Sequence, residues 1–323
     1  AGVISGTSTG VADDTATFTV RVTDEGGLFA DRSFTTTITA IANFLMLAHG
    51  GNATSNTLLR KSLPTPDGGL VHVGYSNGLP GVSNYQLFVV KTDAAGASVW
   101  QKSFDATSTA NTDQSESAAI DSSGNIYICG RTYSGSEYRA LVIKLNSSGV
   151  IQWQRTLHIA GDSSTLFDVT LDSSNNVIAV GSTQSELDGN PVGVLAKYNS
   201  SGAIQWQRVL GGAVSEYFYS IAVDSNDDII CRGQTSSVVS GKTLLLIAKY
   251  NSSGALQFQK TLQSSSGATI HNLYTYGTAL AVDSSDNFYV AASLSGGTYI
   301  GTSNDGFIVK YNSSGIVQWS KLL

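Results

Sequence analysis

The sequence is poor in charge, cysteine and histidine, and each shortage excludes a class of protein. Only 13% of its 323 residues are charged, against about a quarter in a typical soluble domain. Sparse charge combined with 14 tyrosines and 4 tryptophans is not the composition of a disordered chain. Two cysteines are too few for a disulfide-stabilised scaffold, and with only four histidines they disfavour a zinc module.

The balance and distribution of charge and apolar residues narrow the class further. Lys and Arg number 18 against 24 Asp and Glu, so the chain has no basic footprint for nucleic acid. The longest apolar run, Phe44 to Ala48, is far shorter than the roughly 20 residues that span a bilayer. We therefore expect no nucleic-acid partner, no membrane insertion, no metal and no cofactor. No secretion signal opens the sequence, and its start at Ala1 suggests a longer gene product.

What the sequence does contain is repetition. Lys144-Leu-Asn-Ser-Ser-Gly-Val-Ile-Gln-Trp153 recurs almost unchanged from Lys197, Lys249 and Lys310, and a weaker copy starts at Lys91. These five lysines are spaced 53, 53, 52 and 61 residues apart. A second motif lies between the copies, as in Ile221-Ala-Val-Asp224 through Gly233, and has a degenerate first copy from Lys61 to Gly74. The repeat units are about 57–104, 117–157, 168–210, 220–262 and 279–323.

Each unit predicts four β-strands and no helix. In the fourth unit they are 220–224, 228–233, 244–250 and 255–262, called a to d below. Alternating and continuous apolar runs, separated by Asp-Ser-Ser-Gly-Asn and Asn-Ser-Ser-Gly turns, are typical of antiparallel strands. Four strands per repeat with an aromatic at a fixed place predict an all-β fold, a five-bladed β-propeller of four-stranded antiparallel blades. We expect the repeated aromatics to pack between sheets, with sugar stacking as the alternative: Trp100, Trp153, Trp206, Phe258 and Trp319.

The connections differ in a way that predicts a binding face. The a–b and c–d turns are short and nearly constant, whereas the b–c and d–a connections vary in length and content. Hairpin alternation places the first pair at one side of the disc and the second pair at the other. The side with variable connections, the variable face, is the expected binding side.

Residues 1–43 do not match the repeat, which we assign to residues 44–323. Phe18, Val20 and Val22 alternate with polar residues, as do Phe34, Thr36 and Ile38 after a Gly-Gly turn, and this predicts a β-hairpin. Together with Val3-Ile-Ser-Gly-Thr7, these segments resemble the C-terminal part of a cadherin-like, Ig-like domain. Similar modules occur in large virion proteins of tailed phages. We expect a partial Ig-like β-sandwich segment that precedes the propeller and offers a route to homo-oligomers.

The repeats themselves resemble the bacterial and phage β-propeller family called SBBP. The resemblance rests on wording such as Ile221-Ala-Val-Asp224 and Lys197-Tyr-Asn-Ser-Ser-Gly202, and it covers about four fifths of the chain. It implies the fold and almost nothing about function, because propellers host many activities. The sequence departs from the family in the drifting Gln184 to Pro191 connection, so no site is transferred.

No residue set predicts catalysis or metal binding. The histidines occupy non-equivalent positions, and no nucleophile elbow leads into a helix. Asp224-Ser-Asn-Asp-Asp228 superficially resembles a calcium loop but lacks the later bidentate glutamate, so a turn is favoured. The recurring Asn-Ser-Ser triplets are better explained as turns than as glycosylation sites. Cys129 and Cys231 are expected to be buried free thiols in strand b.

Aromatic and histidine side chains in or near the variable connections are the candidate ligand-binding residues, with strand-edge packing as the alternative. They are Tyr133, Tyr138, Tyr217, Tyr219, His271, Tyr274, Tyr276 and Tyr299. The sequence thus favours a non-enzymatic structural and adhesion module of a tailed-phage virion, in its tail, fibre or capsid decoration. Such a module would contact other virion proteins or a host-surface glycan or protein. The alternatives are a secreted or cell-surface bacterial lectin and, third, a propeller glycosidase or lyase.

Overall fold

A computed structural model of the chain forms two compact units, Ala1–Ala48 and His49–Leu323. It describes residues 14–23, 29–38, 57–77, 84–105, 112–157, 163–184, 189–211, 214–236, 243–262, 269–271, 279–295 and 305–322. Throughout these ranges every regular element is a β-strand. None of the described residues forms a helix long and apolar enough to cross a membrane.

The first unit contains a two-stranded antiparallel sheet, β1 (Asp14–Thr23) and β2 (Phe29–Ile38). The register places Phe18 opposite Phe34 and Asp14 opposite Ile38. This is the hairpin that the alternating pattern predicts. The Ig-like identity of the segment, and the boundary after residue 43, stay predictions.

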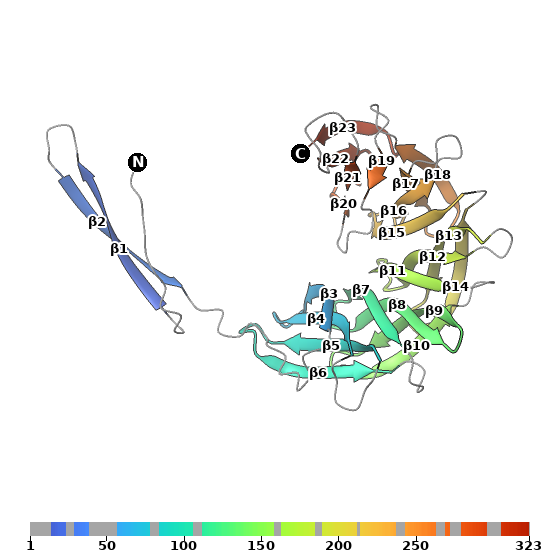
Figure 1. The fold of residues 1–323 in the computed structure, drawn as a ribbon, viewed down its shortest axis with the longest axis horizontal. Helices are drawn as coiled ribbons and strands as arrows, with labels where there is room; N and C mark the ends of the chain where they lie inside the picture. Colours follow the sequence, from blue (N-terminus) through green and yellow to red (C-terminus); the bar gives the residue numbers. More distant parts are fainter. Residues whose placement is uncertain are drawn as a thin grey trace. The chain divides into compact units, whose positions relative to one another are not determined.

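The second unit contains five antiparallel sheets, which follow one another in chain order (Figure 1). The first sheet is β3 (Thr57–Pro64), β4 (Leu70–Ser76), β5 (Gln86–Thr92) and β6 (Ser98–Phe104). The second is β7 (Asp113–Ile120), β8 (Ile126–Ser134), β9 (Glu137–Leu145) and β10 (Ile151–Leu157). The third is β11 (Ser164–Leu171), β12 (Val177–Gln184), β13 (Pro191–Tyr198) and β14 (Ile204–Leu210). The fourth is β15 (Glu216–Val223), β16 (Ile229–Ser236), β17 (Thr243–Tyr250) and β18 (Leu256–Leu262).

The fifth sheet repeats this plan with one change. Its strands b, c and d are β21 (Phe288–Ser295), β22 (Asp305–Tyr311) and β23 (Val317–Leu322). Strand a is split into β19 (Thr269–His271) and β20 (Leu280–Val282), and both pair with β21. The chain is therefore a five-bladed β-propeller, as the repeat predicts.

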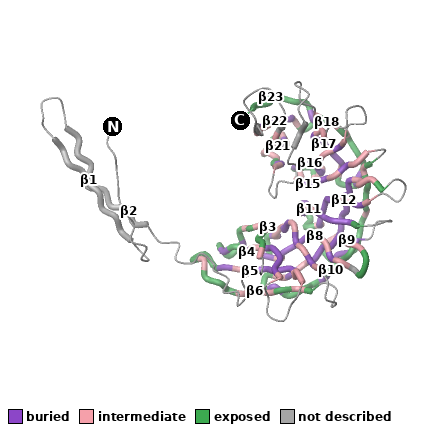
Figure 2. The backbone as a smooth tube through the Cα atoms, viewed as in Figure 1, coloured by how far each residue is buried: buried purple, intermediate pink, exposed green. Residues whose placement is uncertain are grey.

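The blades are ordered from the centre outwards. Each first strand contacts the first strand of the next blade, in the series β3, β7, β11, β15 and β20 (Figure 1). The last strand of each blade lies at the outer edge, where exposed residues concentrate (Figure 2). All six residues of β23 are exposed, whereas β12 and β16 are buried almost throughout.

The core consists of four hydrophobic clusters, one between each pair of consecutive blades. Alternate residues of one sheet enter different clusters: Leu141 and Ile143 face the first blade, whereas Ala140 and Val142 face the third. Strands b and c are thus covered on both faces, which explains their continuous apolar runs. Cys129 and Cys231 lie in these clusters as buried free thiols, which confirms the prediction.

Strands next to the variable connections are longer than the sequence predicts, and this corrects two assignments. β15 begins at Glu216, so Tyr217 and Tyr219 lie in a strand and not in a d–a loop. Tyr133 and Tyr138 face each other in the ladder of β8 and β9 and are not loop residues. The sequence pattern missed the start of β15 because a bulge shifts its register and interrupts its alternation. β8 and β9 instead continue without a bulge up to a tight turn at Gly135 and Ser136.

Candidate functional site

A β-bulge in the innermost strand shapes the centre of the first four blades. The extra residues are Arg60, Glu116, Phe167 and Tyr219, one per blade. Opposite each bulge, strand b carries a glycine: Gly74, Gly130, Gly181 or Gly233. A Cβ at these glycines would overlap a backbone carbonyl oxygen of strand a, so the bulge requires glycine there. The fifth blade has Ala292 at this place, and there strand a is split.

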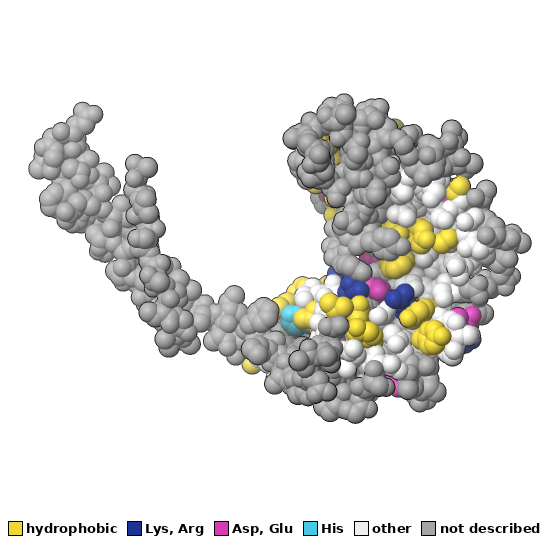
Figure 3. Space-filling model, viewed as in Figure 1, with side chains coloured by type: hydrophobic (Ala, Val, Ile, Leu, Met, Phe, Trp, Pro, Cys, Tyr) yellow, Lys and Arg dark blue, Asp and Glu magenta, His cyan; other side chains and the backbone are white. Residues whose placement is uncertain are grey.

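The bulge residues of adjacent blades contact each other. Arg60 Nε lies 3.5 Å from Glu116 Oε2, with both side chains about nine-tenths buried at 12% and 9% exposure. In the next pair, the rings of Phe167 and Tyr219 lie 5.3 Å apart. The two pairs give the inner rim a charged half and an aromatic half. Figure 3 shows basic and acidic side chains side by side on one face.

The charged half extends into what we call the inner-rim cluster: Arg60, Tyr75, Gln114, Glu116, Arg131, Tyr133 and Tyr138. Arg60 Nη2 donates to the Tyr75 hydroxyl at 2.7 Å, and its guanidinium lies 5.1 Å from the centre of that ring. Burial raises the pKa of Glu116, and the positive charges of Arg60 and Arg131 oppose that rise. The two guanidinium groups thus offset part of the cost of burying the Glu116 carboxyl group at the centre of the cluster.

Arg131 links the cluster to two of the predicted tyrosines. Its Nε and Nη2 donate to Gln114 Oε1 at 2.8 and 2.5 Å, and its Cζ lies 4.3 Å from the centre of the Tyr138 ring. The Tyr133 and Tyr138 rings meet edge to face at 5.1 Å. All three side chains are only partly buried. Tyr138 therefore presents a cation-stacked ring at the variable-face end of β9.

The other predicted residues are distributed differently. The Tyr217 and Tyr219 rings stack at 5.6 Å, and Tyr219 is only 7% exposed, so it packs against the core. His271 ends β19, and its side chain lies outside what the structure describes. Tyr274, Tyr276 and Tyr299 also lie outside the described residues. Among the eight candidates, the described side chains therefore form two separate pairs.

Sequence reasoning missed Arg60, Tyr75, Glu116 and Arg131. None of the four recurs between units, so the repeat gives no sign of them. The available signal was indirect. The recurring glycine of strand b indicates a close backbone approach, and a bulge on the paired strand turns an additional side chain toward the neighbouring blade.

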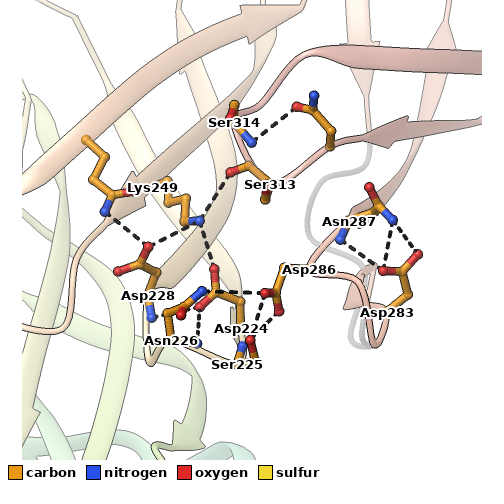
Figure 4. Close-up of polar contacts among 12 residues, drawn as sticks. Asp224, Ser225, Asn226, Asp228, Lys249, Asp283, Asp286, Asn287, Ser313 and Ser314 are labelled. Carbon is orange, nitrogen blue, oxygen red and sulfur yellow. Dashed lines mark hydrogen bonds and ion pairs between the residues drawn. The ribbon is translucent and has the colours of Figure 1, made fainter.

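At the other end of the blades, the repeated charges form structural contacts. Asp224 Oδ1 accepts hydrogen bonds from the backbone of Asn226 and Asp228, which closes the turn (Figure 4). Lys249 Nζ lies 2.8 Å from Asp224 Oδ2 and 3.3 Å from Asp228 Oδ2, and donates to the Ser313 carbonyl of the next blade at 3.2 Å. The ammonium group occupies the place between the carboxylates that a cation would take. This geometry favours the turn interpretation of the calcium-like sequence.

The same plan recurs in the third and fifth blades. Lys197 Nζ lies 2.8 Å from Asp172 Oδ2 and donates to the Ser252 carbonyl of the fourth blade. Burial raises the pKa of Asp172, but hydrogen bonds from Lys197 and Asn176 outweigh it and hold the pKa below its ordinary value. In the fifth blade Lys310 Nζ lies 3.5 Å from Asp283 Oδ2. In the third, fourth and fifth blades the lysine at the end of strand c is therefore half of an ion pair within its blade. Its counterpart Lys144 in the second blade instead donates to the Ser200 carbonyl and lies 5.0 Å from the centre of the Tyr127 ring.

One acid, Asp168, joins three blades at once. Its Oδ1 accepts from Ser117 Oγ at 2.7 Å and from the Val169 amide, and its Oδ2 accepts from Ser220 Oγ and from the Ile221 amide. Burial raises its pKa, and these hydrogen bonds oppose the rise. Each oxygen accepts two hydrogen bonds, and three of the four donors belong to neighbouring blades. The described residues contain no group of three or more His, Cys, Asp and Glu side chains that could hold a metal ion.

Comparison with known proteins shows no matching family model and no matching curated protein. Solved structures do match. One is the subtype N11 neuraminidase-like protein of A/flat-faced bat/Peru/033/2010 (H18N11), at 12% identity and a TM-score of 0.47, over 83% of this chain and 74% of that one. Another is a puromycin hydrolase, at 13% identity and a TM-score of 0.46. The match covers 95% of this chain and 52% of the hydrolase chain.

A third match is the β-propeller domain of the trilobed protease from Pyrococcus furiosus, described as having an open velcro topology. It is 9% identical with a TM-score of 0.45, over 83% of this chain and 70% of that one. The present chain spans about half of the puromycin hydrolase chain. Similarities at this level concern the fold, and the propeller assignment rests on the sheet topology of the chain itself.

Proposed function

We propose that this chain is a non-enzymatic binding and structural module whose propeller holds a partner at the variable face of its first two blades. The observation that supports this is the inner-rim cluster. The repeated Asp and Lys side chains at the opposite end take part in turns and ion pairs within the chain. At the variable-face end, Arg131, Tyr133 and Tyr138 remain partly exposed.

The chemistry of the cluster favours a ligand with a flat or ring-shaped apolar face. The Tyr138 ring can stack on such a face. The Arg131 guanidinium beside that ring adds positive charge for a hydroxyl or carboxylate group of the ligand. A host-surface glycan or an aromatic side chain of a protein partner has this chemistry. We favour a glycan, because its hydroxyl groups can accept hydrogen bonds from the guanidinium beside the Tyr138 ring.

The test is binding to a glycan array by the whole chain and by Tyr138→Ala. Tyr217→Ala is the matched control, since Tyr217 is partly buried and stacks on Tyr219 far from the cluster along the chain. We expect Tyr138→Ala to reduce binding about tenfold or more, as truncation of an interface aromatic does. Equal binding by wild type and Tyr138→Ala would refute the assignment of the cluster.

The resemblance of the N-terminal segment to virion modules, with that of the repeats to a bacterial and phage propeller family, supports a place in a tailed phage, in its tail, fibre or capsid decoration. There the N-terminal segment would act as a spacer and the propeller as the contact head. Mass spectrometry of purified virions tests this directly, and a chain missing from the particles would refute it. A bacterial surface lectin is the alternative, and its test is surface fractionation of the cells that express the gene.

We further propose that the propeller performs no catalysis. Paired carboxylates that hydrolyse a glycosidic bond face a common substrate cleft. The two acids whose pKa is raised by burial are otherwise engaged: Glu116 faces Arg60, and Asp168 binds donors from three blades. A screen with chromogenic glycosides and polyuronates is expected to show no turnover above buffer. Turnover abolished by Glu116→Gln would overturn this.

A further inference from the structure

Consecutive blades are joined at their outer edge by a recurring contact, which we call the clamp. It consists of an aromatic residue of strand d and the basic residue two positions later, whose charged group stands 5.2 to 5.7 Å from the centre of the ring. The five clamps are Trp100–Lys102, Trp153–Arg155, Trp206–Arg208, Phe258–Lys260 and Trp319–Lys321.

Each of the first four clamps holds the c–d turn of the following blade. The aromatic ring lies so close to the glycine of that turn that an added Cβ would come within 2.6 to 3.0 Å of it, at Gly149, Gly202, Gly254 and Gly315. The basic group donates to the carbonyl of the same glycine, as Arg155 Nε does to Gly202 O at 2.7 Å and Arg208 Nε to Gly254 O at 2.8 Å. Ring and turn therefore fit only because the turn residue is glycine.

One clamp and one turn are left over within the part of the chain that the structure describes. Trp319 contacts no further blade among the described residues and is 38% exposed, whereas its counterpart Trp153 is 9% exposed. Gly96, in the c–d turn of the first blade, has the same positive φ of 83° as the occupied glycines, yet a Cβ there would meet nothing within 4 Å. The free clamp and the free turn are the two halves of a contact that the chain makes four times.

The outward sheet faces of the fifth and first blades limit how the free clamp and the free turn can come into contact. In the fifth blade Tyr289 and Ile308 are only partly buried, whereas their counterparts Tyr127 and Val142 pack on the next blade with no exposure. The outward side of the first blade is already covered, since Phe88 and Val90 are 1% and 0% exposed. A full sheet-on-sheet contact with the first blade is therefore blocked. The rim turn with Gly96 is what remains open there.

We propose that the Trp319–Lys321 clamp of one copy binds the Asp93–Ala97 turn of a second copy. The occupant is a copy of the same chain because, among the c–d turns that the structure describes, the turn with Gly96 is the one without a clamp. The contact is head-to-tail, so each copy retains a free clamp or a free turn and assembly continues beyond a dimer. A rim contact of this size gives weak association, which grows where copies are concentrated.

Sedimentation velocity over a hundredfold range of chain concentration tests the proposal. The wild-type chain is expected to sediment faster as concentration rises. Trp319→Ala and Gly96→Asn are each expected to weaken association about tenfold or more. The matched controls are Val317→Ala, on the same exposed strand, and Gly135→Asn, at a positive-φ glycine that also has open space around it. Lys321→Glu is a second clamp variant that retains the tryptophan.

Mixing the two interface variants separates this arrangement from its rivals. Trp319→Ala keeps an intact turn and Gly96→Asn keeps an intact clamp, so their equimolar mixture is expected to form dimers that grow no further. Wild-type chain that stays monomeric at every concentration would overturn the proposal. So would association that persists in both variants, or a mixture that remains monomeric. If Trp319→Ala and Lys321→Glu lower stability as strongly as Trp206→Ala does, the clamp closes within one chain and the proposal fails.

Discussion

The fit between clamp and turn predicts a large difference between two chemically identical substitutions, Gly202→Ala and Gly96→Ala. Both glycines lie in c–d turns with nearly equal φ, 80° and 83°. Placing alanine in this left-handed region costs about 1–2 kcal/mol at either site. Reduced freedom of the unfolded chain returns about 0.4–1 kcal/mol of that cost. Gly96→Ala is therefore expected to lower the free energy of unfolding by about 1 kcal/mol.

Gly202→Ala adds a steric term that Gly96→Ala does not have. Its Cβ would lie 2.6 Å from the Trp153 ring, which is 9% exposed and packed between the second and third blades. Displacing the ring costs about 1–3 kcal/mol, as overpacking does. The displaced ring also loses the hydrogen bond from Trp153 Nε1 to the Ser200 carbonyl, which is 3.1 Å long and contributes about 1 kcal/mol. The total for Gly202→Ala is about 3–5 kcal/mol.

Urea unfolding, followed by tryptophan fluorescence and far-ultraviolet circular dichroism, measures both variants. The two variants should share the m-value of the wild type, so the midpoint difference gives the steric term alone. Trp153→Ala in the Gly202→Ala background is the control, because without the ring the additional cost of Gly202→Ala should vanish. Equal destabilisation by Gly202→Ala and Gly96→Ala would refute the clamp as the source of blade-to-blade stability.

Three further outcomes follow from the repeated contacts. Gly181→Ala is expected to destabilise the fold by about 3 kcal/mol or more in urea, because its Cβ would overlap a carbonyl of the bulged strand. Lys197→Met leaves the carboxylate of Asp172 buried without its partner, at a cost of about 3–5 kcal/mol near pH 7. Hydrogen bonds hold the folded-state pKa of Asp172 below its ordinary value, so its stabilisation is present above the unfolded-state pKa and is lost as pH falls through the lower folded-state pKa. In acid titrations, the free energy of unfolding should therefore fall less below about pH 4 in Lys197→Met than in the wild type. An equal fall in the two proteins would contradict this. Burial raises the pKa of both Cys129 and Cys231, so a thiol reagent at pH 8 should label neither until the chain unfolds, and rapid labelling of the native chain would contradict their burial.

The repeats determine the architecture of this protein by local chemistry. Asp-Ser-Ser-Gly-Asn and Asn-Ser-Ser-Gly segments form turns because the first side chain accepts two backbone hydrogen bonds, as Asn146 does from Ser148 and Val150. The apolar runs between the turns can only be strands that are covered on both faces. Since these signals lie within a few residues of each other, a single unit suffices to predict them, and their number gives five blades.

The inner rim and the free clamp depend on contacts between units, which no local pattern contains. The bulge that turns Glu116 toward Arg60 is set by the fit of strand a against a glycine of strand b. The recurrence of Trp319 predicts a buried core aromatic, yet this residue is 38% exposed because no described blade packs on it. Sequence alone thus determined what each blade is, and the tertiary structure decided which copies of a repeated residue find a partner. The physical reason is that burial depends on neighbouring blades, and among the described blades the first and the fifth each contact only one other.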